Sequence, residues 1–216
     1  MNGNWNSTEK FNNEAALWDS DPRRRALAEA VAAALIARCT PGKAMQALEA
    51  GCGTGLVTMA ISPLVKQLTA IDTSQEMLSI LQDKIRSLEV SNIETALLDL
   101  SSPSVTFERE QSFDLIYSSM TLHHIRDTAG FLCRIATLLA PGGTIAIADL
   151  EREDGHFHDN PDEEVHHGFD RTELTKLMNA AGLQDVSFDT IYTVSKKSSE
   201  GKTTEYPVFL CTATKR

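Results

Sequence analysis

Apolar residues along this chain gather in short runs that alternate with longer stretches of helical periodicity. The short runs predict strands at residues 44–49, 67–71, 93–98, 113–117 and 144–148. The longer stretches predict helices at residues 55–64, 74–88, 127–139 and 171–181. A repeated alternation of strand and helix is typical of βαβ units, so the pattern predicts an α/β fold with a mostly parallel sheet.

The two ends of the chain depart from this alternation. Residues 1–10 are polar and are expected to be flexible, whereas residues 11–38 carry a helical pattern and are expected to form a lid or cap. Within them, Asp21 and Pro22 are typical of a helix start. Residues 183–194 and 204–214 predict an antiparallel pair. Since no repeat or linker interrupts the chain, residues 1–216 are predicted to form a single domain.

Composition narrows the class of protein. Hydrophobic residues make up 42% of the 216 positions, which is enough for a sizeable core. A net charge of −10 repels phosphate backbones and anionic membranes, so we expect neither nucleic acid nor a membrane as a partner. The chain shows no signal-peptide core and no apolar run long enough for a membrane span, so a cytoplasmic location is expected. The four cysteines form no Cys-x-x-Cys pair and are expected to be free thiols.

The candidate ligand site begins at residues 48–55, LEAGCGTG, where a predicted strand meets a predicted helix. Gly51 suits the sharp turn, Gly53 lets a ligand approach the backbone, and Gly55 allows close packing. Dinucleotide-binding folds usually space their glycines G-x-G-x-x-G, whereas this segment reads G-x-G-x-G with Glu49 before it. A turn without a ligand and a nucleotide-binding oxidoreductase remain alternatives for these residues alone.

Two further carboxylates follow the next two predicted strands. Asp72 ends the second strand, where an acidic side chain can accept both hydroxyl groups of a ribose, as it also does in NAD-binding proteins. Asp99 ends the third strand, where a carboxylate can accept a hydrogen bond from an adenine amino group. An aspartate that only caps a loop or helix is the alternative for Asp99.

Five segments taken together resemble the class I S-adenosylmethionine-dependent methyltransferases, and most closely their small bacterial members that act on small molecules. The segments are LEAGCGTG (48–55), AIDTS (70–74), LLDL (97–100), FDLIYSSMTLHHI (113–125) and LAPGG (139–143). The resemblance implies a Rossmann-like seven-stranded sheet, mostly parallel with the last strand antiparallel, and helices on both faces. It also implies S-adenosylmethionine as the cofactor and S-adenosylhomocysteine as its product.

The resemblance further implies which residues contact the cofactor. The glycine-rich turn would hold its methionine and ribose parts, and the ends of the second and third strands would hold its ribose and adenine. The residues implied are Glu49, Gly51, Cys52, Gly53, Asp72, Thr73, Met77, Asp99, Leu100 and Ser118. For Met77, core packing without a ligand is the alternative.

The acceptor side is less clearly marked. His123 and His124 follow the fourth predicted strand, and an imidazole suits proton transfer near neutral pH. We assign His123 as the candidate catalytic residue, with a positioning role favoured over that of a base. Neighbours on a helical turn point in different directions, so only one of the pair is expected to face the reaction centre.

Two other segments complete the expected acceptor side. Residues 149–167 carry four histidines and several carboxylates but match no known ligand spacing. We expect them to form a substrate lid rather than a metal site, and we expect no metal. Phe11 and Trp18 either fold over the cofactor or anchor the first helix.

The leading hypothesis is therefore an enzyme that transfers a methyl group from S-adenosylmethionine to a small-molecule acceptor. A non-catalytic protein that binds S-adenosylmethionine or S-adenosylhomocysteine is one alternative, and a nucleic-acid or protein methyltransferase is another. A nicotinamide oxidoreductase is disfavoured by the glycine spacing and by the absence of a Tyr-x-x-x-Lys pair. The acceptor molecule, its acceptor atom and the oligomeric state stay open.

Overall fold

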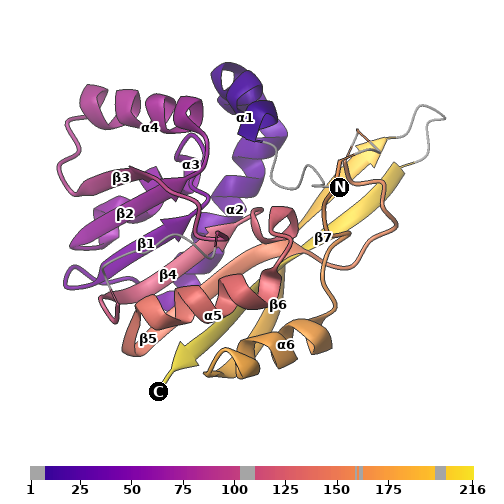
Figure 1. Ribbon diagram of the computed structural model, residues 1–216. Helices are drawn as coiled ribbons and strands as arrows, with labels where there is room; N and C mark the ends of the chain where they lie inside the picture. The colour runs from indigo at the N-terminus through magenta and orange to yellow at the C-terminus, as the bar shows by residue number, and fades with distance from the viewer. Residues whose placement is uncertain (1–7, 103–109, 159, 161–162, 198–202) are drawn as a thin grey trace.

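The computed structural model describes residues 8–102, 110–158, 160, 163–197 and 203–216. A seven-stranded sheet runs through the molecule in the order β3-β2-β1-β4-β5-β7-β6 (Figure 1). Its strands are β1 (Gln46–Ala50), β2 (Gln67–Asp72), β3 (Ile93–Leu97), β4 (Phe113–Ser119), β5 (Leu139–Leu150), β6 (Leu183–Lys197) and β7 (Thr203–Lys215). β1 to β5 pair in parallel, and β7 is antiparallel to both β5 and β6. The predicted sheet with its antiparallel last strand is confirmed.

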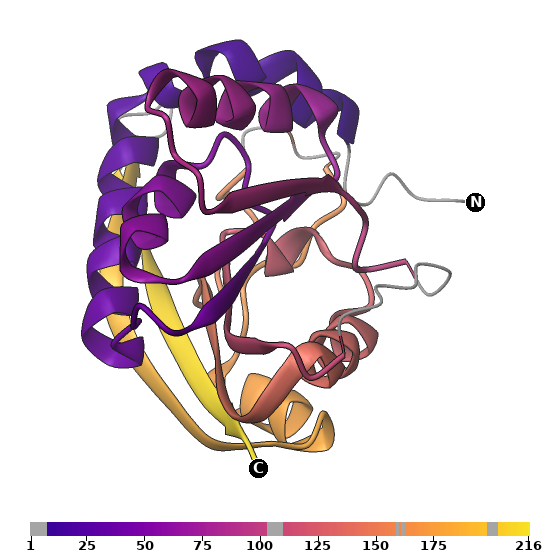
Figure 2. The same cartoon turned by 90° about the vertical axis from the view of Figure 1, so that its left-hand side faces the viewer.

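Helices cover both faces of this sheet (Figures 1 and 2). One face carries α2 (Pro22–Cys39), α3 (Leu56–Ile61) and α4 (Gln75–Ser87), and the other carries α5 (Thr128–Leu138) and α6 (Arg171–Ala180). Shorter elements are α1 (Thr8–Glu14) and the 3-10 turns η1 (Ala15–Ser20), η2 (Ser62–Leu64) and η3 (Leu122–His124). None of the helices in the described part of the chain has the length and apolar character needed to cross a bilayer.

The sheet divides the apolar residues into two cores because side chains of a strand alternate between its faces. In β1, Leu48 packs in the core under α5 and α6, and Ala47 packs in the core under α2, α3 and α4. β4 repeats the pattern with Ile116 on the first face and Leu115 and Tyr117 on the second. Strands buried on both faces explain the nearly continuous apolar runs of the sequence.

Helix starts follow the capping signals in the sequence. Asp21 precedes α2, and its side chain accepts a hydrogen bond from the backbone N–H of Arg23, as the Asp-Pro pair predicted. Ser74 caps α4 by accepting from the N–H of Met77 at 3.1 Å. These caps satisfy backbone donors that the first turn of a helix leaves unpaired.

Two expectations about element bounds need correction. The strand predicted at 144–148 is longer, because β5 starts at Leu139 and holds the Pro-Gly-Gly segment as a bulge between Leu139 and Thr144. The segment expected to be flexible, 1–10, ends in helix, since α1 begins at Thr8 and Lys10 forms an ion pair with Glu163. Residues 1–7 of that segment lie outside the described residues.

The order of strands reverses direction between β1 and β4. In open α/β sheets the crevice at such a switch point, beyond the carboxyl ends of the strands, is where ligands bind. In this protein the glycine-rich segment follows β1 and the histidine pair follows β4, so both candidate segments meet at this crevice.

Candidate functional site

A cavity of about 480 Å³ opens at the carboxyl ends of β1, β2 and β4, and residues of α1, η1 and α2 also line it. Its volume falls within the range of small-molecule binding sites. We call the part formed by residues 49–55, 72–77 and 98–101 the glycine-rich end. His123, His124 and His158 line the same cavity and are called the histidine cluster.

The glycine-rich turn is shaped by two close approaches. Gly51 has φ +76°, and a Cβ there would lie 2.2 Å from the hydroxyl oxygen of Thr121, so a larger residue would clash. Gly53 also has a positive φ, +53°, but a Cβ there would meet no atom within 4 Å. Gly53 therefore leaves free space beside the backbone, into which a ligand can fit.

Asp72 holds this turn in place. Its carboxylate accepts hydrogen bonds from the backbone N–H groups of Gly53 at 2.7 Å and of Ser74 at 2.8 Å. Burial raises the pKa of Asp72, although the backbone hydrogen bonds from Ser74 and Gly53 oppose that rise. A carboxylate has about four acceptor positions, so the backbone donors leave acceptor capacity for a hydroxyl group of a ligand.

Glu49 lies below the turn and is almost fully buried at 1% exposure. One carboxyl oxygen accepts hydrogen bonds from the hydroxyl groups of Thr58 at 2.5 Å and Tyr117 at 2.9 Å. Burial raises the pKa of Glu49 to about 8, so the side chain is mostly protonated and neutral at neutral pH. Glu49 thus connects the turn to α3 and β4 as a buried hydrogen-bonding group.

The remaining residues of the glycine-rich end line the cavity in different ways. Asp99 accepts hydrogen bonds from the N–H and the hydroxyl of Ser101, at 2.8 and 2.6 Å. Met77 and Leu100 are buried at 1% and 5% exposure and present apolar surface to the cavity. Burial also raises the pKa of the Cys52 thiol well above its usual range, so this thiol is neutral.

Nine of the ten residues expected to bind the cofactor line this one cavity. They are Glu49, Gly51, Cys52, Gly53, Asp72, Thr73, Met77, Asp99 and Leu100. Ser118 is the exception, because its buried hydroxyl donates a hydrogen bond to the carbonyl of Ala50 at 2.8 Å and joins β4 to β1. The next residue, Ser119, lines the cavity in its place.

At the other end, His123 is oriented by Asp149. The imidazole Nδ1 lies 2.8 Å from one carboxylate oxygen, and the backbone N–H donates to the other at 3.2 Å. Both side chains are buried, with exposures of 1% and 0%. This contact fixes the orientation of the ring, with Nδ1 toward Asp149 and Nε2 on the opposite side of the ring.

His124 lines the cavity as well as His123, so both members of the pair lie at this space. Which of them faces the reaction centre stays a prediction. The two imidazole rings lie 4.1 Å apart between centroids and tilt by 43°. His124 is further packed against Phe11 of α1, at 5.2 Å between rings. Asp149 orients the ring of His123, and Phe11 packs against the ring of His124. These tertiary contacts differ for the two rings, and a helical turn considered alone does not include them.

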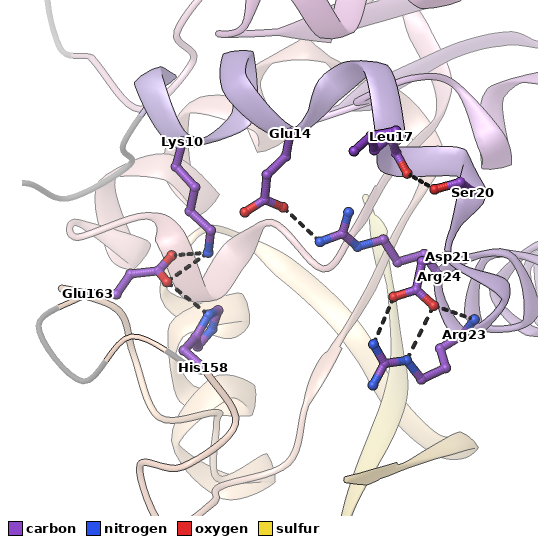
Figure 3. A network of polar contacts seen from close by, with 9 residues as sticks. All are labelled: Lys10, Glu14, Leu17, Ser20, Asp21, Arg23, Arg24, His158 and Glu163. Atoms are coloured by element: carbon purple, nitrogen blue, oxygen red, sulfur yellow. Dashed lines mark hydrogen bonds and ion pairs between the residues drawn. The ribbon is translucent and has the colours of Figure 1, made fainter.

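His158 completes the cluster from the loop after β5. Its ring lies 5.2 Å from that of His123 and 5.3 Å from that of His124. Its Nδ1 is 3.3 Å from a carboxylate oxygen of Glu163, which also accepts from Lys10 at 2.7 Å (Figure 3). Burial lowers the pKa of His158 to about 4 and lowers that of His124 further, so both are neutral at neutral pH.

The N-terminal helices close over the cavity through polar contacts. Lys10 of α1 joins the loop after β5 through Glu163, and Glu14 pairs with Arg24 at 2.7 Å (Figure 3). The guanidinium of Arg24 stacks 3.6 Å from the ring centre of Trp18. Phe11 and Trp18 both line the cavity and contact each other at 5.9 Å. The arrangement therefore favours the lid interpretation of these aromatics.

One wall of the cavity beside the histidine cluster is apolar. Leu27, Met120, Phe157 and Val194 pack around the buried group Leu150, Tyr206 and Val208, and the first four also line the cavity. Val194 comes from β6, whose end rises with β7 beyond the other strands (Figure 1). This space suits an apolar molecule that carries a polar group toward the histidines.

Several site residues could not be assigned a specific role from the sequence, although Asp149 and Glu163 lie in the segment 149–167 that was expected to form a lid. Asp149 is the second-to-last residue of β5, and Asp72 is the last residue of β2, so the place of Asp149 near a strand end was a signal that could have marked it. Tyr117 and Thr58 lie inside predicted elements and gave no signal of their role at Glu49. Lys10 and Glu163 lie 153 positions apart in segments expected to be flexible or mobile, and no sequence pattern joins them.

Comparisons with known proteins agree with this geometry. The family described as "Methyltransferase domain" matches residues 23–187. An uncharacterized methyltransferase of Schizosaccharomyces pombe is 31% identical over 153 residues, which are 65% of this chain and 54% of that protein. A ubiquinone biosynthesis O-methyltransferase of Xanthomonas campestris is 33% identical over 110 residues, 51% of this chain and 45% of that protein. The chain thus spans about half the length of the curated relatives it matches.

A solved structure shares the fold over almost the whole chain. The N-methyltransferase NodS of Bradyrhizobium japonicum, in complex with S-adenosylhomocysteine, superposes with a TM-score of 0.69. The two chains are 18% identical, and the match covers 99% of each. At this identity the comparison shows the fold alone.

Proposed function

The chain belongs to the methyltransferase-domain family of S-adenosylmethionine-dependent enzymes, and from this premise we propose that it methylates a small, largely apolar acceptor with a hydroxyl group. The observation that carries the proposal is the single cavity shared by the glycine-rich end and the histidine cluster. Because both ends open into the same space, a cofactor at one end and an acceptor at the other would meet inside the protein.

The glycine-rich end fits the cofactor. Gly53 leaves room for a ligand beside the backbone, and Asp72 has acceptor positions left for ribose hydroxyl groups. Thr73, Met77, Asp99 and Leu100 would surround the adenine, with Gly51, Cys52 and Glu49 near the methionine part. When bound, S-adenosylmethionine supplies a methyl group on a positively charged sulfur. Ser118 is better explained as a link between strands than as a cofactor contact.

The histidine end fits the acceptor. The apolar wall of Leu27, Met120, Phe157 and Val194 would bind the body of the molecule. Neutral imidazoles would face its polar group, because burial keeps His124 and His158 uncharged. The relative that acts as a ubiquinone biosynthesis O-methyltransferase supports a hydroxyl acceptor, and the net charge of −10 argues against a nucleic acid.

The chain's own residues would act mainly by positioning and by excluding water. α1 and η1 cover the cavity, so the reacting groups would meet in a dry space, where their alignment contributes most to rate. His123 is held by two hydrogen bonds to Asp149, and we assign it a positioning role at the acceptor. No side chain has to supply the reacting methyl group, so positioning is the main requirement.

The test is transfer of labelled methyl from S-adenosylmethionine to a matched panel. The panel holds hydroxylated aromatic molecules, their amine and thiol analogues, and separate arms with RNA, DNA and protein. We expect label in the hydroxylated molecules only. Label confined to a macromolecule, or to the amine analogues, would overturn the proposed acceptor class.

A further inference from the structure

Three imidazoles from two distant segments converge in the histidine cluster. One nitrogen from each of His123, His124 and His158 lies within 4.8 Å of the other two. His123 and His124 are buried, and His158 has a side-chain exposure of 13%. Such a gathering of nitrogen donors has a chemical use beyond the packing of aromatic rings.

His123 has the environment typical of a metal ligand. Its Nδ1 lies 2.8 Å from the Asp149 carboxylate, which fixes the ring and leaves Nε2 as the nitrogen that can coordinate an ion. Histidines that bind metals almost always donate their other ring nitrogen to a carboxylate, a carbonyl or water. Asp149 is fully buried and is itself held by the backbone of His123 and Leu150.

His158 repeats the same pattern from the opposite side. Its Nδ1 lies 3.3 Å from a Glu163 carboxylate oxygen, and Lys10 holds that carboxylate in place. Its Nε2 is buried and has no hydrogen-bond partner among the described residues. A purely structural histidine would satisfy this nitrogen, because a buried unpaired polar atom costs free energy.

We propose that His123, His124 and His158 bind a divalent transition metal ion, with Zn²⁺ as the expected ion. Three imidazoles and one open position form a common catalytic zinc site. The carboxylates of Asp149 and Glu163 lie beside the Nδ1 atoms of His123 and His158, respectively. Their negative charge would offset the positive charge of the ion.

The three histidines could coordinate one ion after a small movement of their rings. In tetrahedral zinc sites with bonds of about 2.0–2.1 Å, ligand nitrogens lie roughly 3.4 Å apart. The observed limit of 4.8 Å therefore requires the rings to approach by at most about 1.4 Å. His158 lies on the loop after β5, outside the helices and strands, so it can make this movement.

All three histidines line the cavity, so the fourth coordination position is available from the cavity side. An acceptor hydroxyl could occupy it, and this role rests on the function proposed above. His123 then positions the acceptor through the metal. The proposal opposes the sequence-based expectation of no metal, which overlooked that η3 and the loop after β5 meet.

The test compares tag-free wild-type protein with two single variants after treatment with a chelator. His158→Gln removes a proposed ligand, and His156→Gln is the matched control, since His156 is exposed on the same loop. Zn²⁺ is titrated into each protein with a competing chromophoric chelator, and Co²⁺ is added separately to record its visible absorption. Melting temperature with and without Zn²⁺ gives a third measurement.

We expect wild type and His156→Gln to bind one Zn²⁺ and to give the absorption of four-coordinate Co²⁺. His158→Gln should bind Zn²⁺ at least about 100-fold more weakly and lose that spectrum. Equal binding by His158→Gln and wild type, or no stoichiometric binding by wild type, would overturn the metal site.

Binding of S-adenosylhomocysteine and methyl transfer to the panel are measured on the same proteins. Methyl transfer to hydroxylated acceptors by wild-type protein that binds no Zn²⁺ overturns the metal site and leaves the proposed function standing. Stoichiometric Zn²⁺ binding lost in His158→Gln, without methylation of any small molecule, supports the metal site and removes the proposed function.

Discussion

The two ends of the cavity are built in opposite ways. The glycine-rich end is made of short segments that each follow a strand, and hydrogen bonds between neighbouring segments hold it, such as Gly53 to Asp72. The histidine cluster is made of η3 and a loop after β5, and it is held by residues as distant as Lys10. The first end depends on the sheet, and the second depends on how the segments outside the sheet fold over it.

This difference predicts different responses to substitution. Changes at the glycine-rich end should alter cofactor binding and stability together, because the same atoms that shape the turn also face the ligand. Changes at the histidine cluster should alter turnover with little effect on cofactor affinity.

Glu49→Gln should change the pH dependence of stability. The folded pKa of Glu49, about 8, exceeds its ordinary value of 4.5. Between these values the unfolded chain releases the proton and the folded chain retains it, so Glu49 lowers stability as pH rises. The glutamine side chain cannot ionise, so the free energy of unfolding of the variant should gain roughly 3–5 kcal/mol relative to wild type between pH 5 and 9.

Urea unfolding at several pH values measures this effect. Glu29→Gln is the control, because Glu29 is exposed on α2. A constant difference between Glu49→Gln and wild type across pH would contradict the raised pKa of Glu49.

Asp72→Ala should weaken S-adenosylhomocysteine binding by roughly 2–4 kcal/mol, because it removes charge-assisted hydrogen bonds to ribose. It should also destabilise the fold, since the N–H groups of Gly53 and Ser74 lose their acceptor. Calorimetry and urea unfolding measure the two effects. Asp83→Ala, at an exposed ion pair with Arg86, should change neither. Full cofactor affinity in Asp72→Ala would exclude the ribose contact.

Asp149→Asn should lower turnover by about 10–100-fold, because His123 loses the carboxylate that fixes its ring. Affinity for S-adenosylhomocysteine should stay within about twofold of wild type, since Asp149 is not among the residues that line the cavity. Asp154→Asn, at an exposed position on the loop after β5, is the control. If cofactor affinity fell as much as turnover, the two ends would not be independent.

Lys10→Met should have the smallest effect on stability. Lys10 keeps a side-chain exposure of 33%, and an ion pair of this kind contributes about 1 kcal/mol or less. Its loss should raise KM for the acceptor, because Lys10 ties α1 to the loop that carries His158. A double-mutant cycle with Glu163→Gln measures the coupling. Additive effects of the two substitutions would mean that the pair does not hold the lid.

Much of the fold could be predicted from the sequence because its signals are local. Each predicted strand and helix of the βαβ region is present, and the Asp21 cap forms as the Asp-Pro pair indicated. The errors lie where tertiary contacts decide the outcome. Residues 8–10 belong to α1, and Lys10 there pairs with Glu163 of a distant loop. β5 extends back to Leu139, which pairs with Phe113 of β4.

The residues of the candidate site likewise separate into those that the sequence predicted and those that tertiary contacts determine. Nine of ten expected cofactor residues line one cavity, because the carboxyl ends of parallel strands lie at one edge and put motifs that are distant in sequence side by side. Ser118 departed from this pattern because strand alternation turned its hydroxyl toward Ala50. The role of each of these residues in cofactor binding stays a prediction.

The α/β class and the glycine-rich turn could be predicted from the sequence, because periodicity, capping and glycine spacing act over a few residues. The family was indicated by the resemblance of five segments taken together. Tertiary contacts bring His123, His124 and His158 together, place Asp149 and Glu163 beside the Nδ1 atoms of two of them, and pack α1 over the cavity. Those contacts join positions up to 153 residues apart. A local sequence pattern cannot predict contacts between such distant residues, because these contacts depend on how every intervening element packs.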